Sequence, residues 1–359
     1  MFSGSYHSED VQFLLKQVVV PDTPVQLKEA LIQSGKRHYS ELLTREELPS
    51  EDYVNLFQGA MQANGLRVAM DVARLAAAIV ATRQRGIVLV SLARAGTPIG
   101  VLLKRVLWQC YQLDVPHYSV SILRDVGLDN NALRYVLQRH APESLVFVDG
   151  WTGKGVIAQQ LAASLQAFAA SDGVVIPAEL YVLADLSGSA AVAASYEDYL
   201  IPSCLLNATV SGLVSRTVYQ PHLEGQGFHG CVYYSEYQEH DLSGYFVDTL
   251  CKMVDCRDSV KQYAYTSGQD KFAQQVIAKS FLQGMARCYG VGHDNYIKPG
   301  IGEATRVLLR RKARLLLLRQ SDNEATRHLR WLAHNKAVPI IVRNDLPYQA
   351  AAIIQEVNL

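Results

Sequence analysis

The sequence predicts an α/β protein with a parallel, doubly wound sheet, a helical N-terminal region and a small C-terminal α/β/α domain. Three observations lead to this prediction. Apolar β-branched runs alternate with amphipathic stretches between residues 87 and 184, which is typical of βαβ units. The first 85 residues carry helix-start signals. The residues after 297 repeat the strand–helix alternation on a smaller scale.

Composition indicates a well-packed globular protein. Apolar residues make up 49% of the 359 residues and charged residues 19%, and the formal net charge is zero. That neutrality hides a division, because Lys298–Arg343 hold eleven basic residues against three acidic ones. The six cysteines form no CxxC pair, and no secretory signal or membrane-spanning apolar run stands out. We therefore expect reduced, mostly buried thiols, a cytoplasmic location and no membrane partner.

Two helix-start signals open the chain. Ser8–Asp10 and Ser50–Asp52 each place acidic residues in the first turn of an apolar-periodic stretch. The second helix is expected to run from residue 52 to about 83, with an interruption at Asn64-Gly65.

The central region alternates between strands and helices. The strands are expected at 87–92, 117–123, 145–149 and 180–184, and the helices at 98–110, 131–140 and 156–169. Residues 196–256 are harder to interpret and include a tyrosine-rich strand at 232–237, and a polar linker and a helix at 271–289 follow. The expected division is a helical extension (1–85), an α/β domain (86–256), a linker with a long helix (257–297) and the tail domain (298–359).

The strongest local signal is the segment LVFVDGWTGKGVIAQQL, from Leu145 to Leu161. An apolar strand ends in Asp149, a loop rich in glycine follows, and a helix begins at once. Ligands of open parallel sheets lie outside the carboxyl ends of strands, and helix N-termini favour anions. The sequence therefore predicts a phosphate-binding loop, with these residues: Gly150, Thr152, Gly153, Lys154 and Gly155.

Two further loops are expected at the same edge of the sheet. The loop Ala93, Arg94, Ala95 and Gly96 joins a basic residue to small residues whose backbone can approach a second anion. The next strand is followed by Arg124 and Asp125, ahead of a glycine. Each charged residue alone is also compatible with a solvated loop tip.

The loops SLARAGTP and VFVDGWTGKG give residues 87–184 a resemblance to type I phosphoribosyltransferases. This resemblance implies a sheet of that kind and phosphoribosyl pyrophosphate bound with Mg²⁺. Asp149 would hold ribose hydroxyls or magnesium waters, Thr152–Gly155 the 5-phosphate and Ala93–Gly96 the pyrophosphate, with Arg124 and Asp125 as a closing hood. The sequence departs from the family pattern in one place. The family has two adjacent acidic residues before this loop, whereas here Asp149 is followed directly by Gly150 and the loop is shorter.

Four segments make the whole chain resemble the bacterial StiP family, named for a cysteine protease and associated with tellurite-resistance and stress operons. They are YSVSILRDVGLDNNALRYVLQRH, FVDGWTGKG, DYLIPSCLLNATVSGLVSRTV and Phe228-His229-Gly230. The resemblance implies a phosphoribosyltransferase-like domain joined to a pelota-type domain. Two interpretations of the function therefore compete: the cysteine protease that the family name implies, and the phosphoribosyltransferase that the loops imply.

The middle segment offers a nucleophile for the protease interpretation. Cys204 needs an imidazole to form a thiolate, and His222 and His229 are the nearest histidines in sequence. A lone cysteine among Ser, Leu and Leu is more often a buried small apolar residue, so the protease interpretation ranks second. Arg216, in the same segment, could instead bind an anionic substrate.

The tail resembles the pelota and ribosomal-protein family of RNA-binding domains, in which a glycine-rich helix start lies against RNA backbone. The residues expected to bind RNA are Lys298, Gly300, Gly302, Arg306, Arg310 and Arg311. A basic helix that docks on the acidic body is the alternative.

Together these features lead to the prediction of a phosphoribosyl transfer from phosphoribosyl pyrophosphate to a base-like acceptor, assisted by Mg²⁺, with an RNA-binding tail. The alternatives are a cysteine protease that uses Cys204 with His229, and a non-catalytic nucleotide- or RNA-binding protein.

Overall fold

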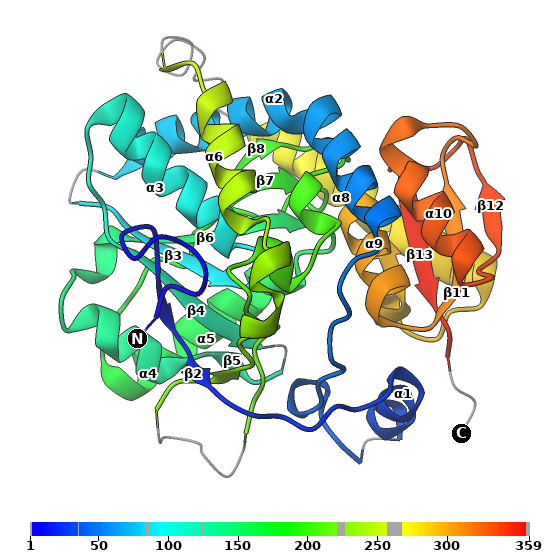
Figure 1. Cartoon of the computed structure of the whole chain (residues 1–359), viewed down its shortest axis with the longest axis horizontal. Coiled ribbons are helices and arrows are strands. Elements are labelled where there is room, and N and C mark those ends of the chain that lie inside the picture. The colour runs from blue at the N-terminus through cyan, green and yellow to red at the C-terminus, as the bar shows by residue number, and fades with distance from the viewer. Residues whose placement is uncertain are drawn as a thin grey trace.

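A parallel sheet forms the centre of the body. The computed structural model describes residues 2–34, 36–83, 86–123, 125–220, 227–256 and 268–356. Neighbouring strands in the sheet follow the order β1, β4, β3, β6, β7, β8, and all of these pairs are parallel (Figure 1). A short β5 pairs with β4 in the antiparallel sense. The strands are β1 (Gln12–Leu14), β3 (Val88–Ala93), β4 (His117–Leu123), β5 (Gly127–Leu128), β6 (Leu145–Thr152), β7 (Leu180–Asp185) and β8 (Val192–Ser195).

Helices cover both faces of this sheet, which confirms the predicted α/β class. On one face α2 (Glu51–Thr82), α3 (Thr97–Tyr111) and α6 (Ser243–Met253) pack against one another and share a core with the sheet. On the other face α4 (Asn130–Leu137) and α5 (Val156–Asp172) bury a second core. Buried strands between two helical layers explain why these strands read as continuous apolar runs.

The N-terminal region differs from the expected helical extension. Residues 8–10 form a turn, and the following residues form β1, which extends the sheet beyond β4. Phe13 and Leu14 are fully buried on opposite faces of the sheet, so pairing with β4 outweighs the helix-start signal. A short α1 (Val25–Gln33) and a 3-10 turn (Tyr39–Glu41) follow. The α2 helix runs without the expected interruption, because Gly65 is buried in it against Met253.

The segment between β8 and α6 contains mostly short turns. Two 3-10 turns span Pro202–Cys204 and Ala208–Val210, and a third spans Ser235–His240. The expected strand at 232–237 is therefore wrong, since β9 (Gly230–Cys231) ends before it. β9 pairs with β2 (Lys16–Gln17) from the N-terminal region. Arg124, His222 and residues 257–267 of the expected linker lie outside the described residues.

The tail has its own mixed sheet. Its strand order is β10, β13, β11, β12, with helices α8, α9 and α10 around it. The sequence patterns did not predict β10, at the edge of this sheet, or β13, which lies between β10 and β11. Both strands are short, and β10 ends in a proline while β13 begins with three alanines. The elements are α8 (Gly268–Tyr289), β10 (Ile297–Pro299), α9 (Ile301–Arg310), β11 (Ala313–Leu318), α10 (Arg327–Asn335), β12 (Ile340–Val342) and β13 (Ala350–Ile354).

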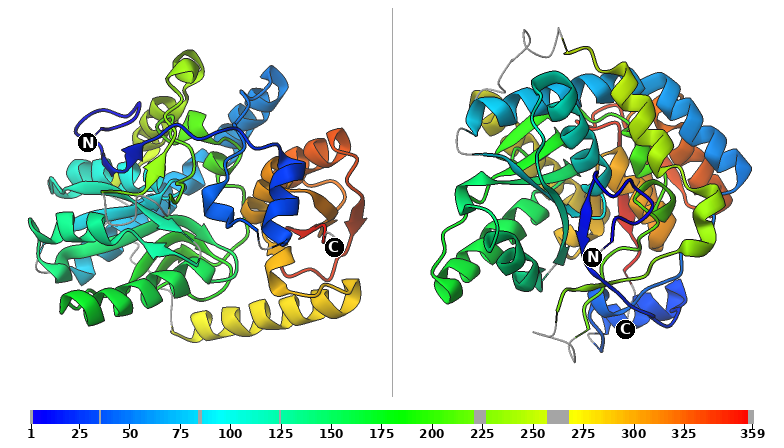
Figure 2. Two further views of the ribbon diagram at one scale, coloured as in Figure 1. Left: turned by 90° about the horizontal axis from the view of Figure 1, so that it is seen from below. Right: turned by 60° about the vertical axis from the view of Figure 1, so that its left-hand side comes forward.

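The tail lies beside the body (Figure 2). The first turn of α9 forms a contact between them. The Asp198 carboxylate accepts hydrogen bonds from the backbone N–H of Ile301 at 2.9 Å and of Gln349 at 2.8 Å. The Arg306 guanidinium lies over the Trp151 ring at 4.3 Å. Apolar residues of α9 belong to the same buried core as those of β6, so body and tail share one interior.

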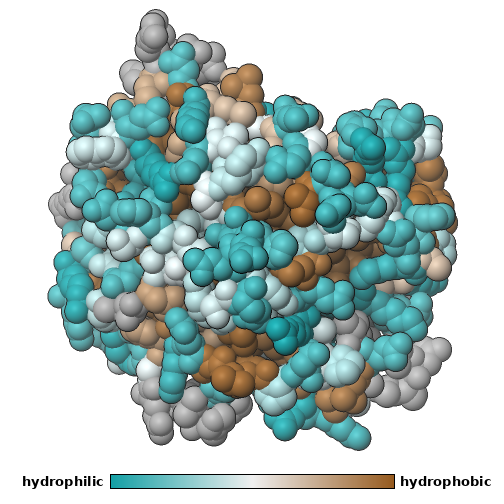
Figure 3. Space-filling view, in the orientation of Figure 1, coloured by the Kyte–Doolittle hydropathy of each residue, from teal (hydrophilic) through white to brown (hydrophobic). Residues whose placement is uncertain are grey.

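Polar side chains cover most of the face shown in Figure 3, and hydrophobic patches lie between body and tail. Among the described helices, none is both long and apolar enough to cross a bilayer.

A disulfide corrects the expectation of six reduced thiols. Cys110 at the end of α3 is bonded to Cys256 just after α6, with the two Cα atoms 5.1 Å apart. The packing of α3 against α6 brings these cysteines together across 146 residues of sequence, which spacing alone could not reveal. Cys204 and Cys231 are free and buried, as expected.

Substitution of Gly302 by alanine tests the docking contact. An added Cβ would lie 2.6 Å from Trp151 ring atoms, and Arg306 covers that ring, so the ring has little room to shift. We expect Gly302→Ala to lower the free energy of unfolding by about 1–3 kcal/mol, measured by urea denaturation. The matched control is Gly284→Ala in α8, where nothing lies within 4 Å and the change should stabilise by about 0.5–1 kcal/mol. Equal effects at both positions would contradict the docking.

Candidate functional site

Asp149 lies inside the sheet. β6 extends to Thr152, three residues beyond the expected end of the strand, so Asp149 is a buried strand residue with 7% exposure. Its Oδ1 accepts a hydrogen bond from the backbone N–H of Gly150 at 2.8 Å. Burial raises the pKa of Asp149 to about 6, and the nearby Arg306 guanidinium of α9 limits that rise. The charged group facing this carboxylate is thus supplied by the tail.

The loop expected to hold a phosphate is covered by the tail. The Lys154 ammonium donates to the backbone carbonyl of Asp294 at 2.5 Å. A Cβ on Gly153 would lie 3.0 Å from the carbonyl oxygen of Pro299 and 3.1 Å from the Glu303 side chain. The Thr152 hydroxyl accepts from the backbone N–H of Gly155, as in an ordinary capped turn. These contacts are between domains or within the loop itself.

Arg94 of the first loop is held within the body. Its guanidinium is 6% exposed and forms an ion pair with Glu46, which comes from the segment before α2. It also donates to the carbonyl of Val214 at 2.7 Å and to Asn207 Oδ1 at 3.3 Å. The neighbouring small residues Ala93, Ala95 and Gly96 allow the backbone to turn closely against β6, where a Cβ on Gly96 would meet the Val148 carbonyl.

The described contacts of Asp125 are with residues other than Asp149. Its carboxylate is 3.5 Å from His38 Nε2, and its backbone N–H donates to Gln160 Oε1 at 3.1 Å. Neither contact involves the loop after β6. The expected hood therefore has one member placed beside α5 and one, Arg124, outside the described residues.

Cys204 faces the tail at the interface between body and tail. Its thiol is 5% exposed, and Sγ lies 4.0 Å from Thr305 Oγ1 of α9. The Thr305 hydroxyl lies 2.8 Å from His328 Nε2 of α10, and it donates to the backbone carbonyl of Ile301 at 2.8 Å. Through the Thr305 side chain, these contacts join the free cysteine Cys204 to the histidine His328.

Burial keeps both ends of this chain uncharged. It raises the pKa of the Cys204 thiol to about 12 and lowers the pKa of His328 to about 3. His328 Nδ1 is buried without a hydrogen-bond partner among the described atoms, and so are Ser203 Oγ and Trp151 Nε1 nearby. A thiolate–imidazolium pair is therefore disfavoured while the interface is closed.

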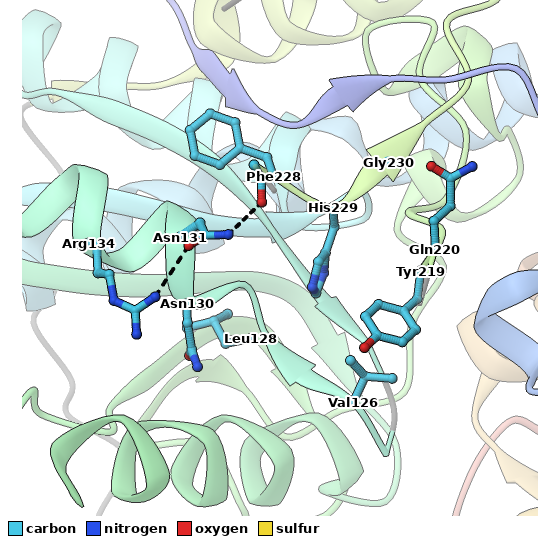
Figure 4. Close-up of a pocket in the computed structure, with 11 residues that line it drawn as sticks. Val126, Leu128, Asn130, Asn131, Arg134, Tyr219, Gln220, Phe228, His229 and Gly230 are labelled. Atoms are coloured by element: carbon cyan, nitrogen blue, oxygen red, sulfur yellow. Dashed lines mark hydrogen bonds between the residues drawn. The ribbon is translucent and has the colours of Figure 1, made fainter. Parts of the chain in front are cut away.

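His229 lies in a separate pocket of about 250 Å³ at the edge of the body. Figure 4 shows its ring near Tyr219, facing across the pocket from Asn131 and Arg134. His229 Nδ1 lies 2.8 Å from Ser121 Oγ, and its backbone N–H donates to Asp129 Oδ2 at 2.6 Å. These partners share no residue with those of Cys204, so the described contacts do not bring the suggested Cys204–His229 pair together.

The residues expected to bind RNA are divided between two places. Gly300, Gly302 and Arg306 pack against the body, where a Cβ on Gly300 would meet Leu186 and one on Gly302 would meet Trp151. Lys298 lies in β10, paired with β13. Arg310 and Arg311, at the end of α9, line a groove between body and tail, and Arg216 of the body lines the same groove.

Sequence reasoning missed the partners of Cys204. Thr305 and His328 lie about 100 and 124 positions from it, on amphipathic helices whose polar residues resemble solvated ones. Glu46, which pairs with Arg94, was missed for the same reason. No spacing in the sequence signals such contacts. Those of Cys204 form only when the tail packs on the body, and that of Arg94 only when the segment before α2 packs on the first loop.

The comparisons with known proteins fit this two-part α/β architecture with a cysteine at the interface. The family model described as "Tellurite-like stress resistance cysteine protease StiP" matches residues 4–251, and the model "PELOTA RNA binding domain" matches residues 276–356. The chain therefore belongs to the StiP family. It is 40% identical over 368 residues to Cysteine protease StiP of Acinetobacter baylyi, covering 99% of this chain and 95% of the relative.

A solved structure, cytoplasmic aspartate aminotransferase from Giardia lamblia, is 13% identical, with a TM-score of 0.22 over 78% of this chain and 68% of that chain. A similarity at that level supports no conclusion about this fold or its function.

The comparisons overturn the predicted phosphoribosyl transfer. The family and the relative are both named for a cysteine protease, which was the alternative interpretation. The contacts of Lys154 and Arg94 show where the residues expected to bind phosphate are engaged instead. The expectations of Mg²⁺ and of a cytoplasmic location stay predictions. Within the described ranges no group of three or more His, Cys, Asp or Glu side chains is arranged to hold a metal ion.

The buried Asp149 predicts a pH dependence of stability. Below about pH 4 its carboxyl is protonated in both the folded and unfolded chains. As the pH rises towards 6, the unfolded chain releases this proton first, so the contribution of Asp149 to stability is lost across that window. A rise of about two pKa units corresponds to about 3 kcal/mol.

We therefore expect Asp149→Asn to gain about 3 kcal/mol relative to the wild type between pH 4 and pH 7, measured by urea denaturation at each pH. The control is Asp322→Asn, at a side chain that is 96% exposed and so not subject to desolvation. A constant difference between Asp149→Asn and the wild type across this range would contradict a buried, protonated carboxyl.

Proposed function

We propose that the protein is a cysteine protease in which Cys204 is the nucleophile and His328 the base. The single observation behind the proposed activity is the 40% identity to Cysteine protease StiP along 99% of the chain. The choice of residues is supported by the path from Cys204 Sγ through Thr305 Oγ1 to His328 Nε2. The nucleophile belongs to the part matched by the StiP model and the base to the pelota part.

The reaction would follow the general course of thiol proteases. Cys204 Sγ attacks the carbonyl carbon of a peptide bond and forms a C–S bond, while Thr305 accepts the thiol proton. The hydroxyl proton of Thr305, which the structure directs to the Ile301 carbonyl, turns to His328 and passes to its Nε2. The imidazolium then protonates the amine as the C–N bond breaks. Water hydrolyses the thioester, releases the acid and restores the thiol.

The closed interface implies that the resting protein is latent. A thiol with a pKa of about 12 and an imidazole with a pKa of about 3 do not exchange a proton near neutral pH. Hydration of the interface would bring both values towards their usual range, because desolvation is the main cause of both shifts. Loosening of the contact between α9 and the body would therefore have to precede catalysis.

A second activity is supported by the tail. Its match to a pelota RNA-binding domain and its excess of basic residues favour binding of RNA. In this closed arrangement the turn from Gly300 to Gly302 packs against the body, so RNA would reach that turn only after the domains separate. Two finer points stay predictions: a sheet of the phosphoribosyltransferase kind, and RNA contact through that turn.

Hydrolysis of a fluorogenic peptide library tests the protease. We expect Cys204→Ser to lower the rate by about 1,000-fold or more, because a hydroxyl cannot replace the thiolate. The matched control is Cys231→Ser, at a free cysteine that is equally buried and whose pKa is also raised to about 12 by burial. Thr305→Val, which keeps the side-chain volume, should lower the rate if the hydroxyl carries the proton.

Two results would reject this assignment. Loss of activity in Cys231→Ser but not in Cys204→Ser would identify another nucleophile. The absence of peptide hydrolysis by the wild type, alone and with single-stranded RNA present, would reject the protease itself.

A further inference from the structure

A groove of about 440 Å³ lies between the body and the tail. We call it the interdomain groove. The body contributes α1, the segment before α2 and the turn after Cys204, and the tail contributes the ends of α9 and α10. Its lining includes six cationic residues and two acidic ones: Lys28, Arg45, Arg216, Arg310, Arg311, Lys336, Glu46 and Glu47.

One of the two acids is already engaged inside the protein. Glu46 is paired with the buried Arg94 and accepts a hydrogen bond from the backbone N–H of Ala208 at 3.0 Å. Its negative charge is therefore offset by a cation that does not line the groove. Arg45 is likewise paired outside the groove, with Glu236 at 2.8 Å. The other five lining cations face one remaining acid, Glu47, and this excess of positive charge suits an anionic ligand.

Tyr53 provides an independent sign of a polar ligand. It lines the groove and is 5% exposed, and its hydroxyl is buried with no hydrogen-bond partner among the described atoms. A buried hydroxyl without a partner loses its hydrogen bonds to water and gains none in return. Arg310 lines the same groove, so a hydrogen-bond donor and a cation lie on one surface.

Aromatic rings lie beside these polar groups. The Tyr53 ring is in contact with the half-buried Trp331 of α10, with ring centroids 5.5 Å apart. Tyr237 lines the groove from the body but is buried, as is Tyr53, so Trp331 offers the most accessible ring face of the three. Cations combined with aromatic faces are typical of single-stranded nucleic-acid sites, where phosphates meet cations and bases stack on rings. An acidic peptide would use the cations but not the rings.

We propose that the interdomain groove binds a nucleotide unit of single-stranded RNA, and that the body completes a site of which the tail provides only a part. The inference rests on the proposed RNA binding by the tail, whose match includes Arg310, Arg311 and Trp331. It adds the body residues Arg45 and Arg216 to that surface. RNA would thus contact both domains beside Leu205, the residue that follows Cys204.

Fluorescence anisotropy of a labelled RNA of about 12 nucleotides tests this with the full chain, at several salt concentrations. We expect Arg216→Gln to weaken binding about tenfold and to reduce the slope of log K against log salt by about 1. Arg45→Gln, at an exposed side chain, should act in the same direction and covers the case in which Arg216→Gln fails to fold. Tyr53→Phe should weaken binding about fivefold without changing the salt slope.

The matched control is Arg139→Gln at the end of α4, where an exposed arginine lies over the Tyr135 ring outside the groove. Affinity and salt slope should equal those of the wild type, and thermal melting checks that each variant folds. Unlabelled RNA should displace the probe far better than adenosine monophosphate or inorganic phosphate.

Each of the following results would reject one part of the proposal. Absence of RNA binding by the wild type would reject both the groove and RNA binding by the tail. RNA binding that Arg216→Gln, Arg45→Gln and Tyr53→Phe all leave unchanged would reject the groove alone. Displacement by poly-glutamate as effective as by RNA would indicate an acidic protein partner, and equal displacement by the mononucleotide would indicate a free nucleotide.

Discussion

The contact between the first turn of α9 and the body determines the arrangement of the Cys204 site and of the interdomain groove. The Asp198 carboxylate accepts backbone N–H groups from two parts of the tail, Ile301 and Gln349, and so fixes the tail in orientation as well as position. Only glycine fits where α9 meets Trp151, because any side chain at 302 would overlap the ring. Such a contact is specific because it combines directed hydrogen bonds with a close backbone approach.

This docking explains how one chain can combine an acidic body with a basic tail. Part of the tail's charge is used inside the molecule, since Arg306 faces Asp149 and Trp151. Other tail cations, Arg310 and Arg311, lie along the interdomain groove. The sequence raised two alternatives for these charges, and the tail takes part in both: Arg306 and Arg310 contact the body, while Arg310 and Arg311 line a groove that suits an anion.

The same contact links the two proposed activities. Cys204 lies against Thr305 of the tail, and the groove begins at the next residues of the body. A ligand that changed the position of α9 would change the solvation of the thiol, and with it the pKa of Cys204. Body and tail share one buried core, so such a change would cost part of that core's stability. RNA bound across both domains in the closed arrangement would favour that arrangement and so keep the Cys204 thiol desolvated.

The sequence alone determined the strands and helices of the body wherever apolar periodicity was strong. The strand at His117–Leu123 was predicted at its observed bounds, because polar and apolar residues alternate along it as is typical of a strand. The sequence also indicated membership of the StiP family. Only tertiary structure decided that residues 12–14 form a strand, that Cys110 meets Cys256, and that Cys204 meets Thr305 instead of His229. Those pairings join distant parts of the chain, and periodicity records only which residues are buried, while the partner of each depends on how the domains pack.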